Sequence, residues 1–194
     1  MKVLFVLPSF GEVESMKMCI ASLRCQTNPN WEATIINNGP NKEMLEVGRL
    51  MCQMDPRVWY TDTEVDTGTP THNRLNGVKA EWGPNADIIT TSSIQDYYLP
   101  NAVDEIIKAA QTGAEFIIWN SMNHHYNANA ILYAEPKINC IDWGNFALTT
   151  EVAKREWMPY EPINDHHADG VFAEHLAKLN LKTHKIDKVL TIHN

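Results

Sequence analysis

The feature that most constrains the fold is a regular alternation of short apolar runs with amphipathic helical segments, which continues to about residue 119. The apolar runs that predict strands are residues 2–8, 31–37, 57–61, 87–91 and 115–119. The segments that predict helices are residues 13–23, 41–54, 70–82 and 101–111. This alternation is typical of a mainly parallel sheet with helices on both faces. The sequence therefore predicts an α/β fold.

The pattern after residue 119 is less regular. Residues 120–141 are rich in Asn and Tyr and predict loops with short strands. The segments with a clearer pattern are two helical ones, 150–157 and 169–179, and three strand-like ones, 145–149, 182–186 and 189–192. Short strands of this kind indicate a small antiparallel part at the C-terminal end. The length of 194 residues suits one domain, 1–194.

Charge and apolar content exclude two classes of protein. The formal net charge of −8 argues against a general nucleic-acid binder, which needs a basic face. No stretch approaches the ~20 consecutive apolar residues of a membrane span, and the N-terminal run is too short for a signal peptide. The four cysteines form no CxxC pair, which is typical of reduced thiols. We expect a cytoplasmic protein.

The stretch IITTSSIQDYYLP, residues 88–100, is the first candidate for a site. It begins as a buried strand and ends in a polar turn with one acid, Asp96. Open α/β sheets bind their ligands where such strands end. A carboxylate there can hold a divalent cation, which can hold a diphosphate. The alternative is that Asp96 is only a turn residue or the N-cap of the helix that starts near Pro100.

Four motifs together resemble the family 2 glycosyltransferases of the GT-A (Rossmann-like) fold. The most specific motif is SLRCQTNPNWEATIINNGPN, residues 22–41, which looks like the family's second strand and the turn that receives the nucleotide base. FVLPSF, residues 5–10, is similar to the first-strand turn, and residues 97–101 to the exit from the metal-binding turn. The fourth motif is a helix with Asn73, Arg74, Gly77 and Ala80.

The sequence departs from this family at two places. The family carries Asp-x-Asp at the end of the central strand, where this chain has Ser93 and Gln95, with Asp96 directly after. The Asp-x-Asp motif is therefore degenerate. At the turn for the base, Asn37 and Asn38 replace the usual acids. An Asn side chain can still pair with a pyrimidine edge through one donor and one acceptor.

The resemblance implies that the first half, residues 1–100, binds a nucleotide sugar. The donor that we expect is a UDP-hexose, in particular UDP-glucose. The residues expected to bind the nucleotide are Pro8, Ser9, Phe10, Glu12, Asn37, Asn38, Arg74, Ser93 and Gln95. For Arg74, a surface position without contact to phosphate or base is the alternative.

The resemblance also implies a metal site. Asp96 is the first expected ligand, and His193, near the chain end, is the second. A disordered C-terminal His is the alternative for His193. A carboxylate, an imidazole and two phosphate oxygens would suit Mn²⁺, with Mg²⁺ as the other choice. The ion would neutralise the diphosphate as it leaves.

The second half, residues 101–194, is expected to bind the acceptor and to supply the catalytic base. Asp169, just before an amphipathic helix, is the expected base, with Asp165 as the second choice and helix capping as the alternative. A base on the side opposite the diphosphate implies inversion at the anomeric carbon. The residues expected to contact sugar or acceptor are Trp143, Gly144, Asn145 and His167. A core position is the alternative for Trp143.

Other functions have weaker support in the sequence. The His pairs at 124–125 and 166–167 do not form a zinc chelate by themselves, and HExxH is absent. A protein that binds nucleotide sugars or carbohydrates without catalysis remains the main rival, because the paired acids are missing. A nucleotidyltransferase would need a Gly-rich, basic first loop. The chain ends soon after its core motifs, so we expect a minimal catalytic domain, of the kind that a viral genome encodes.

Overall fold

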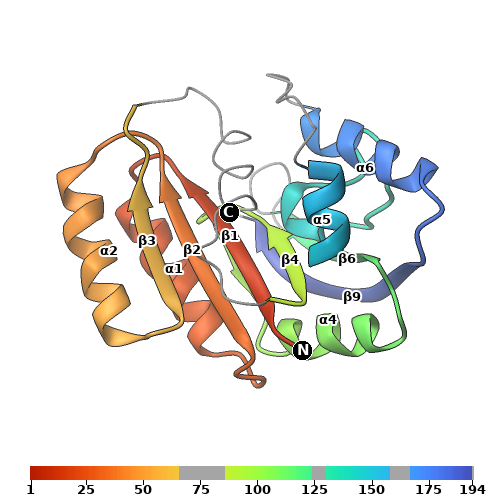
Figure 1. The fold of residues 1–194 in the computed structure, drawn as a ribbon, viewed down its shortest axis with the longest axis horizontal. Coiled ribbons are helices and arrows are strands. Elements are labelled where there is room, and N and C mark those ends of the chain that lie inside the picture. Colours follow the sequence, from red (N-terminus) through yellow and green to blue (C-terminus); the bar gives the residue numbers. More distant parts are fainter. Residues whose placement is uncertain (66–85, 124–129, 158–166, 194) are drawn as a thin grey trace.

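The computed structural model describes residues 1–65, 86–123, 130–157 and 167–193. Within these ranges the strands form one nine-stranded sheet, which curls across the molecule (Figure 1). The strands are β1 (Val3–Ser9), β2 (Trp31–Asn37), β3 (Val58–Asp62), β4 (Ile88–Thr91), β5 (Asp96–Tyr98), β6 (Phe116–Asn123), β7 (Ala130–Leu132), β8 (Phe146–Thr149) and β9 (Thr183–His193). The helices are α1 (Val13–Arg24), α2 (Lys42–Met54), α4 (Ala102–Gln111), η1 (Trp143–Asn145), α5 (Thr150–Trp157) and α6 (Ala168–Lys178).

The first half of the sheet is parallel, as the alternation predicts. β1 pairs in parallel with β2 on one side and with β4 on the other, and β3 pairs with the outer edge of β2. All residues of β1 and β2 are buried. Strands that are buried on both faces need apolar residues on both, which explains why their sequences are apolar runs without alternation.

Helices cover both faces of the sheet and close two separate cores (Figure 1). On one face, α1, α2 and α4 pack on the odd-numbered residues of β1, such as Phe5. On the other face, α5 and α6 pack on the even-numbered residues, such as Val6. The α/β class is therefore confirmed. The predicted helix over residues 70–82 lies outside the described residues. None of the described helices is both long and apolar enough to cross a bilayer.

Antiparallel pairing begins at β8, which lies between β4 and β6 and runs opposite to both. β9 is parallel to β6, and the short strand β5 pairs antiparallel with the end of β9. The two predicted strands at 182–186 and 189–192 are one strand, because the pairing with β6 continues past an irregularity. At this irregularity, Trp119 pairs with Ile186 and the next residue, Asn120, pairs with Val189.

Hydrogen bonds stabilise both ends of α2. The side chain of Asn41 accepts from the backbone N–H of Met44 and caps α2. At the other end of α2, the carboxylate of Asp55 accepts from Nε and Nη2 of Arg57 at 2.9 and 2.8 Å. The guanidinium of Arg57 also lies 3.9 Å from the centre of the Trp31 ring. Through Arg57, the C-terminal end of α2 therefore contacts the first residue of β2.

We expect the substitution Asp55→Asn to destabilise the protein in a pH-dependent way. The hydrogen bonds from Arg57 hold the pKa of Asp55 below its usual value in the folded state. The stabilisation is thus complete above the unfolded-state pKa of about 4 and is lost as the pH falls through the folded-state pKa. Urea unfolding should show a loss of about 1–3 kcal/mol at pH 7 and a smaller one at pH 3. Asp187→Asn, which makes the same charge change at an exposed position, is the control. Equal losses at both pH values would contradict the expectation.

Candidate active site

A cleft of about 290 Å³ opens at the carboxyl ends of β1 and β4. Its lining residues are Pro8, Ser9, Phe10, Glu12, Ser93, Ile94, Gln95, Asp142, Trp143 and His193. This is the place where open α/β sheets bind ligands. The hydroxyl of Ser9 is buried and has no hydrogen-bond partner among the described residues. A buried hydroxyl without a partner is costly, so a ligand that bonds to Ser9 would be favoured.

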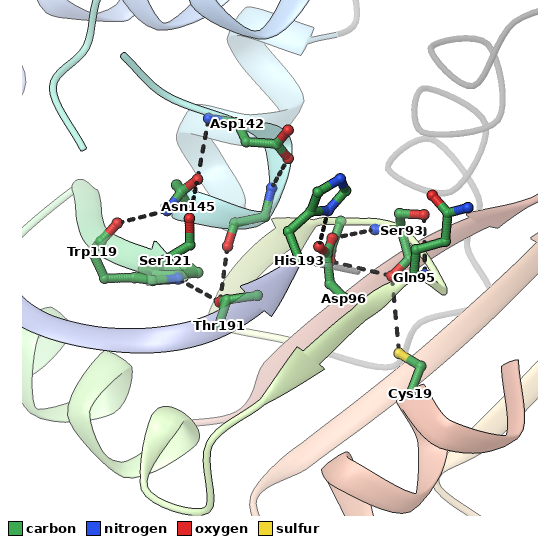
Figure 2. Close-up of polar contacts among 12 residues, drawn as sticks. Cys19, Ser93, Gln95, Asp96, Trp119, Ser121, Asp142, Asn145, Thr191 and His193 are labelled. Carbon is green, nitrogen blue, oxygen red and sulfur yellow. Dashed lines mark hydrogen bonds and ion pairs between the residues drawn. The ribbon is translucent and has the colours of Figure 1, made fainter. Parts of the chain in front are cut away.

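Asp96 lies under this cleft and is only 1% exposed. Its Oδ2 accepts from the Ser92 hydroxyl at 2.5 Å and from the Ser93 backbone N–H at 2.9 Å, while its Oδ1 lies 2.6 Å from Nδ1 of His193 (Figure 2). Asp96 is not the N-cap of the next helix, because Asn101 holds that position in α4. Its bonds to Ser92 and Ser93 do hold the turn after β4, which is the other part of the alternative. Asp96 also starts β5, a strand that the sequence did not predict.

The titratable side chains behind Asp96 stay neutral. Burial raises the pKa of the Cys19 thiol and of the Tyr98 hydroxyl well above their usual values, and the nearby charge of Asp96 raises both further. They therefore add no charge to the site.

His193 is the last residue of β9 and is held in the sheet. It pairs with Asp96 of β5 on one side and with Asn123 of β6 on the other. Its side chain is 24% exposed and stands between the carboxylates of Asp96 and Asp142 (Figure 2). The alternative of a disordered C-terminal His is therefore wrong, and the structure brings the two predicted metal ligands together.

Asp142 completes a cluster that sequence reasoning missed. Asp96, Asp142 and His193 each offer one ligand atom, and these atoms lie within 4.8 Å of one another. The only signal in the sequence was an acid directly before Trp143 and Gly144 in a turn. Its distance from Asp96 depends on the pairing of β8 with β4, which the sequence does not reveal.

The residues after Asp142 form a buried turn next to the cleft. Asn145 is fully buried, and its amide donates to the Trp119 carbonyl at 2.9 Å. Contrary to the prediction, its side chain is not part of the cleft lining. Gly144 allows a close approach, because a Cβ there would lie 2.9 Å from Oδ2 of Asp96. Trp143 lines the cleft but is 7% exposed and stacks on Trp157, so it is not the exposed platform that we expected.

The turn predicted to receive the base is closed by its own hydrogen bonds. Asn37 is buried; its Oδ1 accepts from the Gly11 N–H, and its Nδ2 donates to the Gly39 carbonyl and to the carboxylate of Asp62. The Tyr60 hydroxyl donates to the same carboxylate at 2.6 Å. Asn37 therefore holds three segments together rather than presenting its amide to a base. Asp62, at the end of β3, is an acid of this region that the sequence analysis did not consider.

Three other predicted residues lie outside the lining of the cleft. Asn38 is half-buried beside Asn37. Asp169 lies in the first turn of α6, where its Oδ1 accepts from the Gly170 N–H, and it is not among the described residues that line the cleft. His167 is exposed at the N-cap position of the same helix. Arg74 lies outside the described residues, as does Asp165.

The sheet and the cleft at the carboxyl ends of its strands are those of an open α/β protein, and comparison with known proteins gives the family. Residues 4–178 match the model of glycosyl transferase family 2, so the chain belongs to this family. No curated protein matches the chain.

Solved structures agree on the fold. A structure of S. aureus TarS residues 1–349 has a TM-score of 0.81 at 12% identity, covering 100% of this chain and 60% of that chain. Its complex with UDP-GlcNAc has a TM-score of 0.79 at 14% identity, covering 99% of this chain and 58% of that chain. The mannosyltransferase PcManGT from Pyrobaculum calidifontis, in complex with GDP-Man and Mn²⁺, has a TM-score of 0.74 at 12% identity. This match covers 99% of this chain and 56% of that chain. The chain thus spans less than two thirds of these structures, and their likeness shows the GT-A fold.

We expect Asp96→Ala to act on both stability and nucleotide binding. Removal of the carboxylate takes an acceptor from the buried Ser92 hydroxyl and from the half-buried Ser93 N–H, which should cost about 1–3 kcal/mol in the free energy of unfolding. UDP binding that depends on Mn²⁺ should also be lost, as measured by calorimetry at a temperature where the variant is folded. Glu151→Ala, which removes an acid at an exposed position of α5, is the control. Unchanged UDP affinity in Mn²⁺ would show that Asp96 has a structural role only.

Proposed function

We propose that this chain is a metal-dependent hexosyltransferase. It would move a hexose from a UDP-sugar, with UDP-glucose as the expected donor, to an acceptor hydroxyl with inversion at the anomeric carbon. The observation that carries the proposal is the cluster of Asp96, Asp142 and His193 at the edge of the cleft. Membership of glycosyl transferase family 2 supports the reaction class.

The charge of the cleft favours a divalent cation. Its described lining includes the acids Glu12 and Asp142, with Asp96 beneath them, and His193 is the one cationic candidate among these lining residues. A diphosphate alone would be repelled by so many carboxylates. A cation held between carboxylates and phosphate oxygens removes this repulsion, so the residues fit a metal-bound donor.

The ligand types suit the expected ions. Carboxylate oxygens suit Mg²⁺ and Mn²⁺, and an imidazole nitrogen favours Mn²⁺ over Mg²⁺. Asp96 and His193 would hold the ion, and their positions are set by the backbone pairing of β5 with β9. When bound, the ion supplies electrostatic stabilisation of the diphosphate leaving group.

Similar structures support the choice of donor and metal. Structures of S. aureus TarS contain UDP and UDP-GlcNAc. The structure of PcManGT contains GDP-Man and Mn²⁺. All of these sugar donors are nucleoside diphosphate sugars, which is the ligand class that the acidic cleft would accept with a metal ion. Ser9 and the exposed Phe10 line the cleft and would contact the nucleotide.

Asp169 is the proposed base. Its helix α6 is connected to the cleft through aromatic packing, because Phe172 stacks on Trp143 with ring centres 5.7 Å apart. Trp143 lines the cleft directly. Asp169 would take the proton of the acceptor hydroxyl as that oxygen attacks the anomeric carbon. The acceptor would enter from the side of α6, opposite the leaving diphosphate.

Thermal unfolding with UDP, GDP or CMP, each in EDTA, Mg²⁺ or Mn²⁺, tests the proposal. A ligand at 100 times its Kd adds about 2.7 kcal/mol, which raises the unfolding midpoint by a few degrees. We expect a rise with UDP only when Mn²⁺ or Mg²⁺ is present. A rise with UDP in EDTA would remove the metal from the proposal. Binding without transfer or hydrolysis of any UDP-hexose would favour the rival, a binding protein without catalysis.

We expect Asp169→Asn to lower turnover by about 10²–10⁴-fold, the usual contribution of a general base. UDP affinity should not change, because Asp169 does not line the described part of the cleft. Glu174→Gln is the matched control, since Glu174 lies on the same helix and its carboxylate only accepts from the Ile138 backbone N–H. Near-normal turnover of Asp169→Asn would contradict this role and direct attention to Asp165.

A further inference from the structure

The structure raises the question of what replaces the missing acid of the family motif. By the resemblance to family 2 glycosyltransferases, Ser93 and Gln95 stand at the two positions of the paired acids. Neither side chain is free: the Ser93 hydroxyl accepts from the Gln95 backbone N–H, and the Gln95 amide donates to Glu12 at 3.0 Å. Both positions therefore carry neutral side chains that already form hydrogen bonds within the site.

We propose that Asp142 is the third protein ligand of the metal ion and takes the place of the missing acid. This inference rests on the proposed metal dependence. Figure 2 shows the Asp142 carboxylate near the His193 ring, and Nδ1 of the same ring lies 2.6 Å from Oδ1 of Asp96. The ligand atoms of the three side chains lie within 4.8 Å of one another, which is close enough for one ion to be bound by all of them.

Strand order explains how an acid from the second half reaches this place. β8 runs antiparallel to β4, and Ala147 pairs with Thr90 near the end of β4. The residues just before β8 therefore extend past the end of β4, where the turn with Ser93 begins. Asp142 lies in this extension, so it approaches Asp96 from the side opposite to α1.

The Asp142 carboxylate is held in place before any ligand binds. Its Oδ1 accepts from the Gly144 N–H at 3.0 Å, and the Asn145 side chain accepts from the Asp142 N–H at 3.2 Å. The Gly144 carbonyl accepts from the Thr191 hydroxyl at 3.1 Å, which ties the turn to the strand that carries His193. A ligand that is already oriented loses little entropy on binding.

One consequence is that the metal joins the two halves of the domain. Asp96 belongs to the nucleotide half, whereas Asp142 and His193 belong to the half that carries α6 and Asp169. The adjacent Trp143 stacks on Phe172 of α6, so the same turn contacts both the metal cluster and the base helix. Donor and acceptor sites would thus share one rigid support.

Direct Mn²⁺ titration of the whole chain, followed by electron paramagnetic resonance without nucleotide, tests Asp142. The substitution Asp142→Asn keeps an oxygen that accepts from Gly144 and removes only the charge. We expect it to weaken Mn²⁺ binding by at least the ~10–100-fold that follows loss of an outer-shell partner. Glu12→Gln, which removes a charge from the same cleft without removing a proposed ligand, is the matched control and should weaken binding much less.

The outcomes separate this inference from the proposed function. Equal Mn²⁺ affinity of wild type and Asp142→Asn, or an equal loss in Glu12→Gln, would overturn the role of Asp142 and leave the transferase proposal intact. Loss of Mn²⁺ binding in Asp142→Asn, without turnover of any nucleotide sugar by the wild type, would support the site and overturn the function. A second readout is the rise of each variant's unfolding midpoint in Mn²⁺ over its own midpoint in EDTA. This difference stays comparable between variants even if Asp142→Asn is less stable. No Mn²⁺ binding by the wild type without nucleotide would overturn the three-ligand site, whereas the proposed function is overturned only if UDP also fails to bind in Mn²⁺.

Discussion

The buried carboxylate of Asp96 is the interaction on which the site depends. One oxygen accepts from Ser92 and Ser93, and the other contacts His193, which lies 97 residues further along the chain. A carboxylate that is 1% exposed is stable only when its oxygens are paired in this way. The pairing fixes the turn after β4 against the end of β9. It also sets the depth of the cleft and the orientation of the imidazole.

A second constraint is the aromatic cluster beneath the turn of Asp142. Trp143 stacks on Trp157 and Phe172, and Phe146 packs beside them. These rings belong to η1, α5, α6 and β8, so they hold the elements of the second half around a single point. Because the cluster is buried, the turn cannot move without exposing large apolar surface. The residue beside it, Asp142, therefore has a defined position relative to both Asp96 and α6.

Much of the fold followed from the residues directly. The run WEATIIN coincides with β2, the helix predicted over residues 41–54 is α2, and the helix predicted over residues 150–157 is α5. These elements are set by local pattern and capping, which act over a few residues. β5 was not predicted, since a strand of three residues has no period of its own and depends on pairing with β9. Trp143 was misjudged for a related reason: an aromatic residue beside Gly has the same local sequence whether it is exposed or covered by α6.

The sequence by itself determined the α/β class, the family resemblance, and two of the three side chains in the proposed metal cluster. It could do so because strand and helix periodicity, and the order of motifs, are properties of neighbouring residues. The tertiary structure decided that Asn37 and Asn145 support the site rather than contact a ligand, because their amides are already bonded inside it. It also decided that Asp142 meets Asp96 and His193. That meeting requires β8 to insert beside β4, and strand order in a sheet is settled by packing between distant segments rather than by any local pattern.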